Sequence, residues 1–177
     1  MFALLALASA LAAPPVDVAI RTSEGTIVVR LDAAHAPRTV KNFLRYVDAK
    51  RYDGTTFYRT VDTKRERSSI DVIQGGLQEP TPQKAFAPIA LEPPARTGLH
   101  NTAGTIAMAR TADPNSAASE FFINLGDDRF LDALGGGYAV FGTVVRGLDV
   151  AQRINVAPAQ GESLDPAVKI ITVRRVR

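Results

Sequence analysis

GTIAMAR at residues 104–110 and SEFFIN at residues 119–124 are the two stretches on which the expected architecture of this chain rests. Both are short, apolar and rich in β-branched or aromatic residues, which is the pattern of buried β-strands. We therefore predict strands over residues 105–109 and 120–125. Because neighbouring side chains on a strand point to opposite faces, Phe121 should lie in the core and Phe122 on the other face.

Similar short segments surround this pair along the chain. Alternating residues 16–20 and β-branched residues 26–31, joined by a turn at 23–25, predict a β-hairpin. The remaining predicted strands cover residues 56–61, 72–73 with a stop at Gly75-Gly76, 89–91, 138–145 and 168–173. The charged residues 62–69 lack a periodic pattern and predict an exposed loop.

Two segments have helical patterns. An apolar stripe at helical spacing follows Pro37 and predicts a helix over residues 37–50. Residues 148–154, after Gly147, predict a second helix. Strands and helices do not alternate regularly along the chain. The pattern therefore favours an antiparallel barrel with helices as plugs over a doubly wound sheet.

Composition narrows the possible functions. The chain has 177 residues, of which 46% are hydrophobic and 22% are charged, and this indicates one globular domain. It has no cysteine and only two histidines, which argues against disulfides, a thiolate nucleophile and a metal centre. No phosphate-binding or nucleophile motif is present, so we expect no cofactor. The net charge is +3 and the basic residues are scattered, so we expect no nucleic-acid partner.

The first residues have the composition of a targeting segment. Residues 1–13 carry no charged side chain and end in small residues, which predicts a signal peptide followed by a single domain over residues 14–177. We therefore expect a periplasmic or secreted protein, or a cytoplasmic one if the segment is not cleaved. The alternative is a buried first helix or strand. The run is too short to span a bilayer, and we expect no membrane span in the mature protein.

Six motifs in a fixed order resemble those of the cyclophilins, the cyclosporin-binding class of peptidyl-prolyl cis/trans isomerases. The motifs are FYR at 57–59, IQGG at 73–76, GTIAMAR at 104–110, SEFFIN at 119–124, FLD at 130–132 and YAVFG at 138–142. The resemblance is greatest to the bacterial periplasmic branch and runs from Val18 to the last strand. It implies a mainly β fold, a closed eight-stranded antiparallel β-barrel capped by two α-helices. It also implies a monomer that rotates Xaa-Pro bonds in unfolded or flexible polypeptides without a cofactor.

The resemblance also assigns roles to residues. Arg59 would be the catalytic residue, since a guanidinium aimed at the pyramidal prolyl nitrogen stabilises the twisted amide more than the planar one. The residues that would bind substrate are Val72, Gln74, Met108, Ala109, Arg110, Phe122, Phe130, Leu131 and Tyr138. Phe130 and Tyr138 stand where the eukaryotic branch has Trp and His. Because the indole N–H donor is lost, we expect weak cyclosporin binding.

The sequence departs from the family in two places. The spacing between Arg59 and Gln74 is longer, and Asp71 stands where the family has a pocket-lining Phe. Either Ile70 replaces that ring, or the pocket is more open and binds proline less well. Glu120 stands where Gln is usual, so its carboxylate could pair with Arg59 and orient it, or could hold it away from substrate.

Two functions follow, with a third weighed against them. The retained Arg59, Gln74 and Phe122 favour an isomerase that accelerates protein folding. Asp71 and the longer loop favour a chaperone or binding module that docks proline-containing segments with little turnover. A small-molecule-binding barrel would need a convergent polar pocket, which the sequence does not suggest. Catalysed cis/trans exchange separates the first function from the second.

Overall fold

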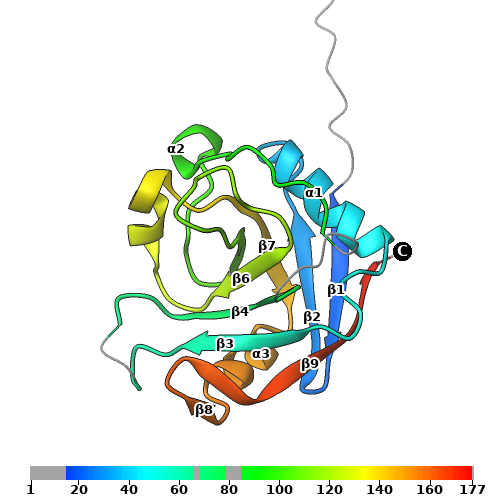
Figure 1. The fold of residues 1–177 in the computed structure, drawn as a ribbon, viewed down its shortest axis with the longest axis vertical. Helices are drawn as coiled ribbons and strands as arrows, with labels where there is room; N and C mark the ends of the chain where they lie inside the picture. Colours follow the sequence, from blue (N-terminus) through cyan, green and yellow to red (C-terminus); the bar gives the residue numbers. More distant parts are fainter. Residues whose placement is uncertain (1–14, 66–67, 79–84, 177) are drawn as a thin grey trace, which may run out of the picture.

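Antiparallel pairing closes the strands of this protein into a barrel (Figure 1). The computed structural model describes residues 15–65, 68–78 and 85–176, so the signal segment predicted over residues 1–13 lies outside the described residues. The strands are β1 (Val16–Thr22), β2 (Gly25–Leu31), β3 (Thr56–Val61), β4 (Val72–Gly76), β5 (Thr105–Met108), β6 (Glu120–Asn124), β7 (Val140–Arg146), β8 (Ala159–Gln160) and β9 (Ser163–Arg175).

The strand order explains the closure. Neighbouring strands follow the order β1-β2-β7-β5-β6-β4-β3-β9, and β9 pairs back with β1. This ring of eight strands confirms the predicted barrel. The two-residue strand β8 was not predicted; it pairs only with β9, outside the ring.

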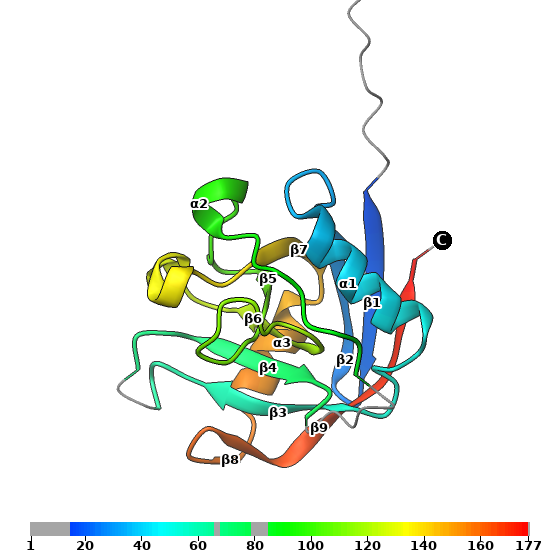
Figure 2. The same ribbon diagram turned by 45° about the horizontal axis from the view of Figure 1, so that its top comes forward.

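Two longer helices flank the barrel, as predicted. They are α1 (Pro37–Asp48) and α3 (Leu148–Asn155), and Figures 1 and 2 show them at different ends of the barrel. Pro37 occupies the first helical turn of α1, where its missing N–H is not needed. Three short helices lie in the connections: α2 (Pro94–Thr97), η1 (Arg129–Asp132) and η2 (Leu134–Gly136).

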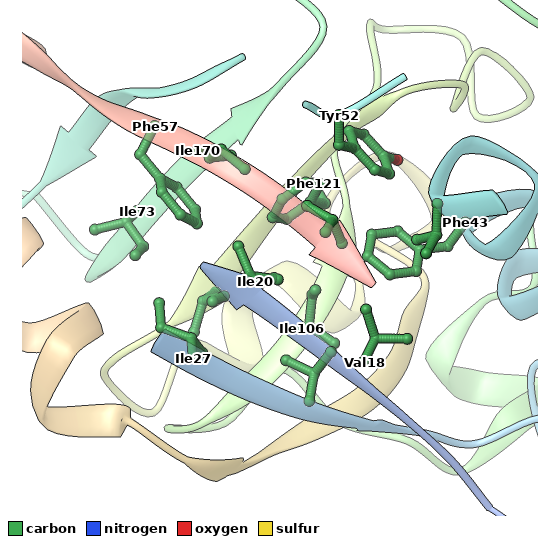
Figure 3. Close-up of a cluster of buried hydrophobic side chains, with 14 of the residues drawn as sticks. Val18, Ile20, Ile27, Phe43, Tyr52, Phe57, Ile73, Ile106, Phe121 and Ile170 are labelled. Atoms are coloured by element: carbon green, nitrogen blue, oxygen red, sulfur yellow. The ribbon is translucent and has the colours of Figure 1, made fainter. Parts of the chain in front are cut away.

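The core fills the inside of the barrel and extends under both longer helices. Figure 3 shows side chains from β1, β2, β3, β4, β5, β6, β9 and α1 meeting there. Phe121 is fully buried, as predicted, and its ring lies 5.4–5.8 Å from those of Phe43, Tyr52 and Phe57. Close aromatic packing of this kind stabilises the barrel beyond the area that it buries.

Two local predictions were wrong. Gly75 and Gly76 were expected to stop their strand, yet they belong to β4. Glycine stands at these positions because the neighbouring chain leaves no room for a side chain. A Cβ on Gly76 would lie 2.5 Å from the backbone oxygen of Ser119 on the neighbouring segment. The strand expected over residues 89–91 is reduced to one bridge between Ile89 and Ala117.

Candidate active site

The register of four neighbouring strands places one row of residues on the outer face of the barrel. Arg59 on β3 pairs with Gln74 on β4, which pairs with Phe122 on β6, which pairs with Ala107 on β5. Residues that alternate with these, such as Phe121, point into the core. The outward residues form a separate apolar cluster, comprising Val61, Val72, Ala107, Ala109, Phe122, Leu131 and Val140.

A pocket of about 160 Å³ opens over this cluster. Its lining brings together residues from strands and loops: Arg59, Ile70, Val72, Gln74, Ala109, Arg110, Phe122, Leu131 and Tyr138. The structure thus gathers all the sequence-predicted site residues around one pocket, apart from Met108 and Phe130. Apolar and aromatic side chains form part of the wall, and Arg59, Gln74 and Arg110 supply polar groups.

Met108 and Phe130 lie elsewhere. Met108 is 1% exposed and packs in the barrel core, because it alternates with its neighbours Ala107 and Ala109, which face outward. The prediction that Met108 contributes to the pocket is therefore wrong. Phe130 precedes Leu131 on η1, and its side chain is 56% exposed outside the pocket lining, whereas Leu131 turns inward.

Two side chains hold the guanidinium of Arg59. Its Nε donates to Oε2 of Glu162 at 2.6 Å, and its Nη1 donates to Oε1 of Gln74 at 2.9 Å. Within the described residues, Nη2 makes no hydrogen bond. The group is thus fixed through two nitrogens, and the third remains for a ligand in the pocket.

Gln74 connects Arg59 to a further pair. Its Nε2 donates to the hydroxyl of Tyr58 at 2.6 Å and to Oε2 of Glu120 at 3.0 Å, and the hydroxyl itself donates to Glu120 at 2.6 Å. Burial and then the neighbouring carboxylate raise the pKa of Tyr58 well above its ordinary value. Glu120 therefore takes neither role expected of it. Among the described contacts, Glu120 makes no hydrogen bond or ion pair with Arg59 and is connected to it through the amide of Gln74.

Arg110 is committed to its own chain. Its guanidinium donates to the backbone oxygens of Leu134, Gly135 and Gly137 at 2.8–3.2 Å and lies 4.4 Å from the ring centre of Tyr138. It therefore holds the segment after η1 against the pocket. Tyr138 in turn packs edge-on against Phe122, with ring centres 5.7 Å apart.

Ile70 completes the apolar wall on the side of the long loop. Of the two outcomes expected around Asp71, the structure shows the one in which Ile70 replaces the aromatic ring. The backbone N–H of Asp71 donates to Oδ1 of Asp128 at 2.9 Å, which ties this loop to the segment before η1. Burial raises the pKa of Asp128 to about 6, and the charge of Asp71 adds to the effect.

The described residues offer no better candidate for a functional site. A larger hollow of about 600 Å³ lies beside α3, but charges of both signs line it, including Asp62, Lys64, Asp71 and Arg153. In the described ranges, no group of three or more His, Cys, Asp or Glu side chains could hold a metal ion. No helix in that part of the chain is long and apolar enough to cross a membrane.

Sequence reasoning missed Tyr58 and Glu162. Regular alternation from the buried Phe57 would put Arg59 on the core face, but a β-bulge between Phe57 and Arg59 turns both Tyr58 and Arg59 toward the site. Tyr58 lies within the FYR motif, and a bulge predicted at that point would have indicated that its side chain faces the site. Glu162 comes from the turn after β8, far along the chain from Arg59, and no local pattern marks it.

Comparisons with known proteins show the family of this chain. The family model "Cyclophilin type peptidyl-prolyl cis-trans isomerase/CLD" matches residues 17–175. The chain is 44% identical over 142 residues to the peptidyl-prolyl cis-trans isomerase cyp18 of Streptomyces antibioticus, a match that covers 77% of this chain and 81% of that protein. It is 42% identical over 159 residues to peptidyl-prolyl cis-trans isomerase A of Dickeya dadantii, covering 85% and 80%.

A solved structure supports the fold. A cyclophilin type peptidyl-prolyl cis-trans isomerase of Cryptosporidium parvum has a TM-score of 0.73 at 21% identity, covering 93% of this chain and 99% of that one. A second structure of that protein, in the presence of the dipeptide Ala-Pro, has a TM-score of 0.70 at 22% identity, covering 91% and 99%.

Proposed function

The chain belongs to the cyclophilin-type peptidyl-prolyl cis-trans isomerases, and we propose that Arg59 carries the reaction in the pocket described above. Rotation of an Xaa-Pro bond makes and breaks no covalent bond, but it must overcome a barrier of roughly 20 kcal/mol. The enzyme therefore needs groups that favour the twisted amide over the planar one.

The observation that carries this proposal is that Nη2 of Arg59 makes no hydrogen bond within the described residues. As the amide twists, the prolyl nitrogen becomes pyramidal and gains a lone pair that can accept a hydrogen bond. Arg59 lines the pocket, and its other two nitrogens already donate to Glu162 and Gln74. A charged donor that is fixed before the reaction contributes about 1.5–3 kcal/mol, and more where water is excluded.

The apolar wall would hold the pyrrolidine ring. Phe122, Leu131 and Val72 are at most 5% exposed, so their side chains are already held by their neighbours. These side chains therefore lose little mobility when the pyrrolidine ring binds against them. Ala109 and Arg110 would hold the substrate backbone, with the guanidinium of Arg110 already occupied. Both the oxygen and the nitrogen of the Gln74 side-chain amide are engaged as well, so we assign Gln74 to positioning Arg59 rather than to binding substrate.

The substrate class would be proline-containing polypeptides. The Ala-Pro dipeptide used with the Cryptosporidium parvum relative supports this choice. A second hollow of about 250 Å³ shares Ala109 and Arg110 with the pocket and reaches Glu120. A flexible chain could thus extend beyond the proline along the same face.

The test is NMR exchange spectroscopy on an Ala-Pro-containing peptide with the full chain and with Arg59→Ala. We expect the native protein to accelerate cis/trans exchange and the variant to lose roughly 100-fold in turnover, which equals about 2.7 kcal/mol. An equally active variant would contradict the role of Arg59. Arg59→Lys keeps the charge but not the forked geometry, and should recover only a small part of the loss.

A proline-segment binding module is the second candidate. The observation that favours it is the ion pair with Glu162, which reduces the positive charge that Arg59 offers to substrate. In the same experiment, peptide resonances that shift without faster exchange would support this candidate over the isomerase.

Export and drug binding are further parts of the proposal. The apolar residues 1–13 support a periplasmic or secreted enzyme of the bacterial periplasmic branch. Mass spectrometry of the protein recovered from a bacterial host should find the amino terminus near residue 14, and an uncleaved cytoplasmic chain would contradict export. Phe130 and Tyr138 support weak cyclosporin binding, and a tight complex in calorimetry would contradict it.

A further inference from the structure

Glu162 reaches Arg59 because of the small hairpin formed by β8 and β9. Gln160 pairs with Ser163 across the turn, and Gly161 between them has a φ of +58°, which favours glycine. The backbone oxygen of Glu162 accepts from the N–H of Thr60 at 2.8 Å. Since Thr60 follows Arg59 on β3, this bond holds the backbone of Glu162 beside β3, from where its side chain reaches the guanidinium.

The contact between the two side chains is directional. Nε of Arg59 donates to Glu162 at 2.6 Å on one edge of the planar group, while Nη1 donates to Gln74 at 2.9 Å. One anchor alone would leave the long side chain free to swing. Two anchors fix both its position and the plane in which Nη2 lies.

Stability does not explain this ion pair well. The side chains of Arg59 and Glu162 are 33% and 43% exposed, and pairs as exposed as this add little to folding. An effect on the orientation of Arg59 would instead be expressed in turnover, because catalysis depends on geometry at the reacting atoms.

We propose that Glu162 is a positioning residue, which holds Nε of Arg59 so that Nη2 faces the prolyl nitrogen of the substrate. This inference rests on the proposed function of Arg59. The carboxylate also offsets part of the positive charge of Arg59, which acts in the opposite direction. Solvent screens the carboxylate charge at this partly exposed site. We therefore expect the benefit of a fixed Arg59 to exceed the cost of a weaker positive charge at the substrate.

The test uses three variants of the full chain. Glu162→Ala removes the anchor, Glu162→Gln removes the charge but keeps an oxygen that can accept from Nε, and Asp165→Ala is the matched control. Asp165 lies in the same hairpin and accepts from Nε2 of Gln160 at 2.6 Å, but it does not contact Arg59. Exchange spectroscopy at several peptide concentrations gives kcat and KM, and the ¹⁵N–¹H signal of the Arg59 Nε–H reports its anchoring.

We expect Glu162→Ala to lower kcat about fivefold, with KM within about twofold and faster solvent exchange of the Nε–H. Glu162→Gln should stay within about twofold of the native kcat and keep the Nε–H signal, and Asp165→Ala should behave as the native protein.

Three results would overturn the inference. One is an unchanged or higher kcat in Glu162→Ala, and another is an equal loss in Asp165→Ala. The third is a Glu162→Gln variant as impaired as Glu162→Ala that still keeps the Nε–H signal, since charge rather than orientation would then matter. An inactive native protein would instead contradict the proposed function itself.

Discussion

The pocket has a strand-built half and a loop-built half, and different forces fix their side chains. Arg59, Gln74 and Phe122 lie opposite one another on paired strands, so the hydrogen-bond ladder sets their spacing. Ile70 and Leu131 lie on connections that individual bonds hold in place, such as the one from the N–H of Asp71 to Asp128. Arg59, which is proposed to act on the amide, thus lies on the half that the hydrogen-bond ladder holds.

This difference suggests a division of labour. A ladder moves only if several bonds break together, so the strand-built half suits groups that must meet a transition state within a fraction of an ångström. The loop-built half encloses the ring, and it can shift by a rotamer without disturbing Arg59. Substitutions in the two halves should therefore affect the protein in different ways.

After Arg59→Ala, Phe122→Ala should cause the largest loss of activity, because this ring is the apolar centre of the strand-built half. It is 5% exposed, and its removal takes away a wall that contacts both the pocket and Tyr138. We expect kcat/KM in the exchange assay to fall roughly 30-fold, or about 2 kcal/mol. Phe122→Leu, which keeps apolar volume, should recover most of it. A loss smaller than that of Ile70→Ala would break the comparison.

Asp128→Asn should change the pH dependence of stability through the loop-built half. Burial raises the pKa of Asp128 to about 6, so the folded protein holds this proton more tightly than the unfolded chain. The resulting stabilisation is complete below about pH 4 and is lost as the pH rises through about 6. The side chain of Asn does not titrate, so the variant lacks this pH dependence. The variant should therefore gain up to roughly 2–3 kcal/mol of unfolding free energy relative to the native protein between pH 4 and pH 7.

Urea unfolding at pH 4, 5, 6 and 7 measures this difference. Asp127→Asn is the control, because Asp127 is a neighbouring exposed residue. A difference between Asp128→Asn and the native protein that stays constant across the pH range would contradict the raised pKa.

Ile70→Ala should weaken the loop-built wall by a smaller amount. Ile70 is only partly buried, and its truncation leaves the strand-built half intact. We expect kcat/KM to fall about fivefold, or about 1 kcal/mol, mainly through a higher KM. Ser69→Ala changes an exposed position of the same loop and should have no effect. A fall in kcat with an unchanged KM would place Ile70 in the reaction rather than in ring binding.

Glu120→Gln should have the smallest effect, because it acts on Arg59 through Gln74. Oε2 of Glu120 accepts from both Tyr58 and Gln74, and a neutral amide oxygen accepts less strongly. We expect kcat to fall about threefold. Tyr58→Phe removes one of these bonds and should give a loss of similar size. If Glu120→Gln turned over as fast as the native enzyme, its charge would have no role.

The division of the pocket into a strand-built and a loop-built half also explains which site residues the sequence could predict. Alternation and β-branched composition located β3, β5 and β6, and the motifs identified Arg59, Gln74 and Phe122 on them. Met108 shows the limit of a motif, since the motif names residues without saying which face each occupies. Only the pairing of β5 with β6 and β7 settles that Ala107 faces outward and Met108 inward.

Contacts between distant turns could not be predicted. Glu162 is 103 residues from Arg59, and its approach depends on a two-residue strand that no periodic pattern can reveal. Asp128 is likewise 57 residues from Asp71, and its role depends on how two irregular segments meet. In both cases the contact forms only because a hydrogen bond joins segments that are far apart in the sequence.

The closure of the barrel by β9 also constrains how the protein is made. β9 pairs with β1 on one side and with β3 on the other, so it completes two edges at once. A ribosome delivers β1 and β3 long before Ser163–Arg175 emerges. During synthesis both edges therefore stay unpaired, and open edges invite association with other chains. The folding of this isomerase thus depends on a strand that is made long after the two strands that it joins.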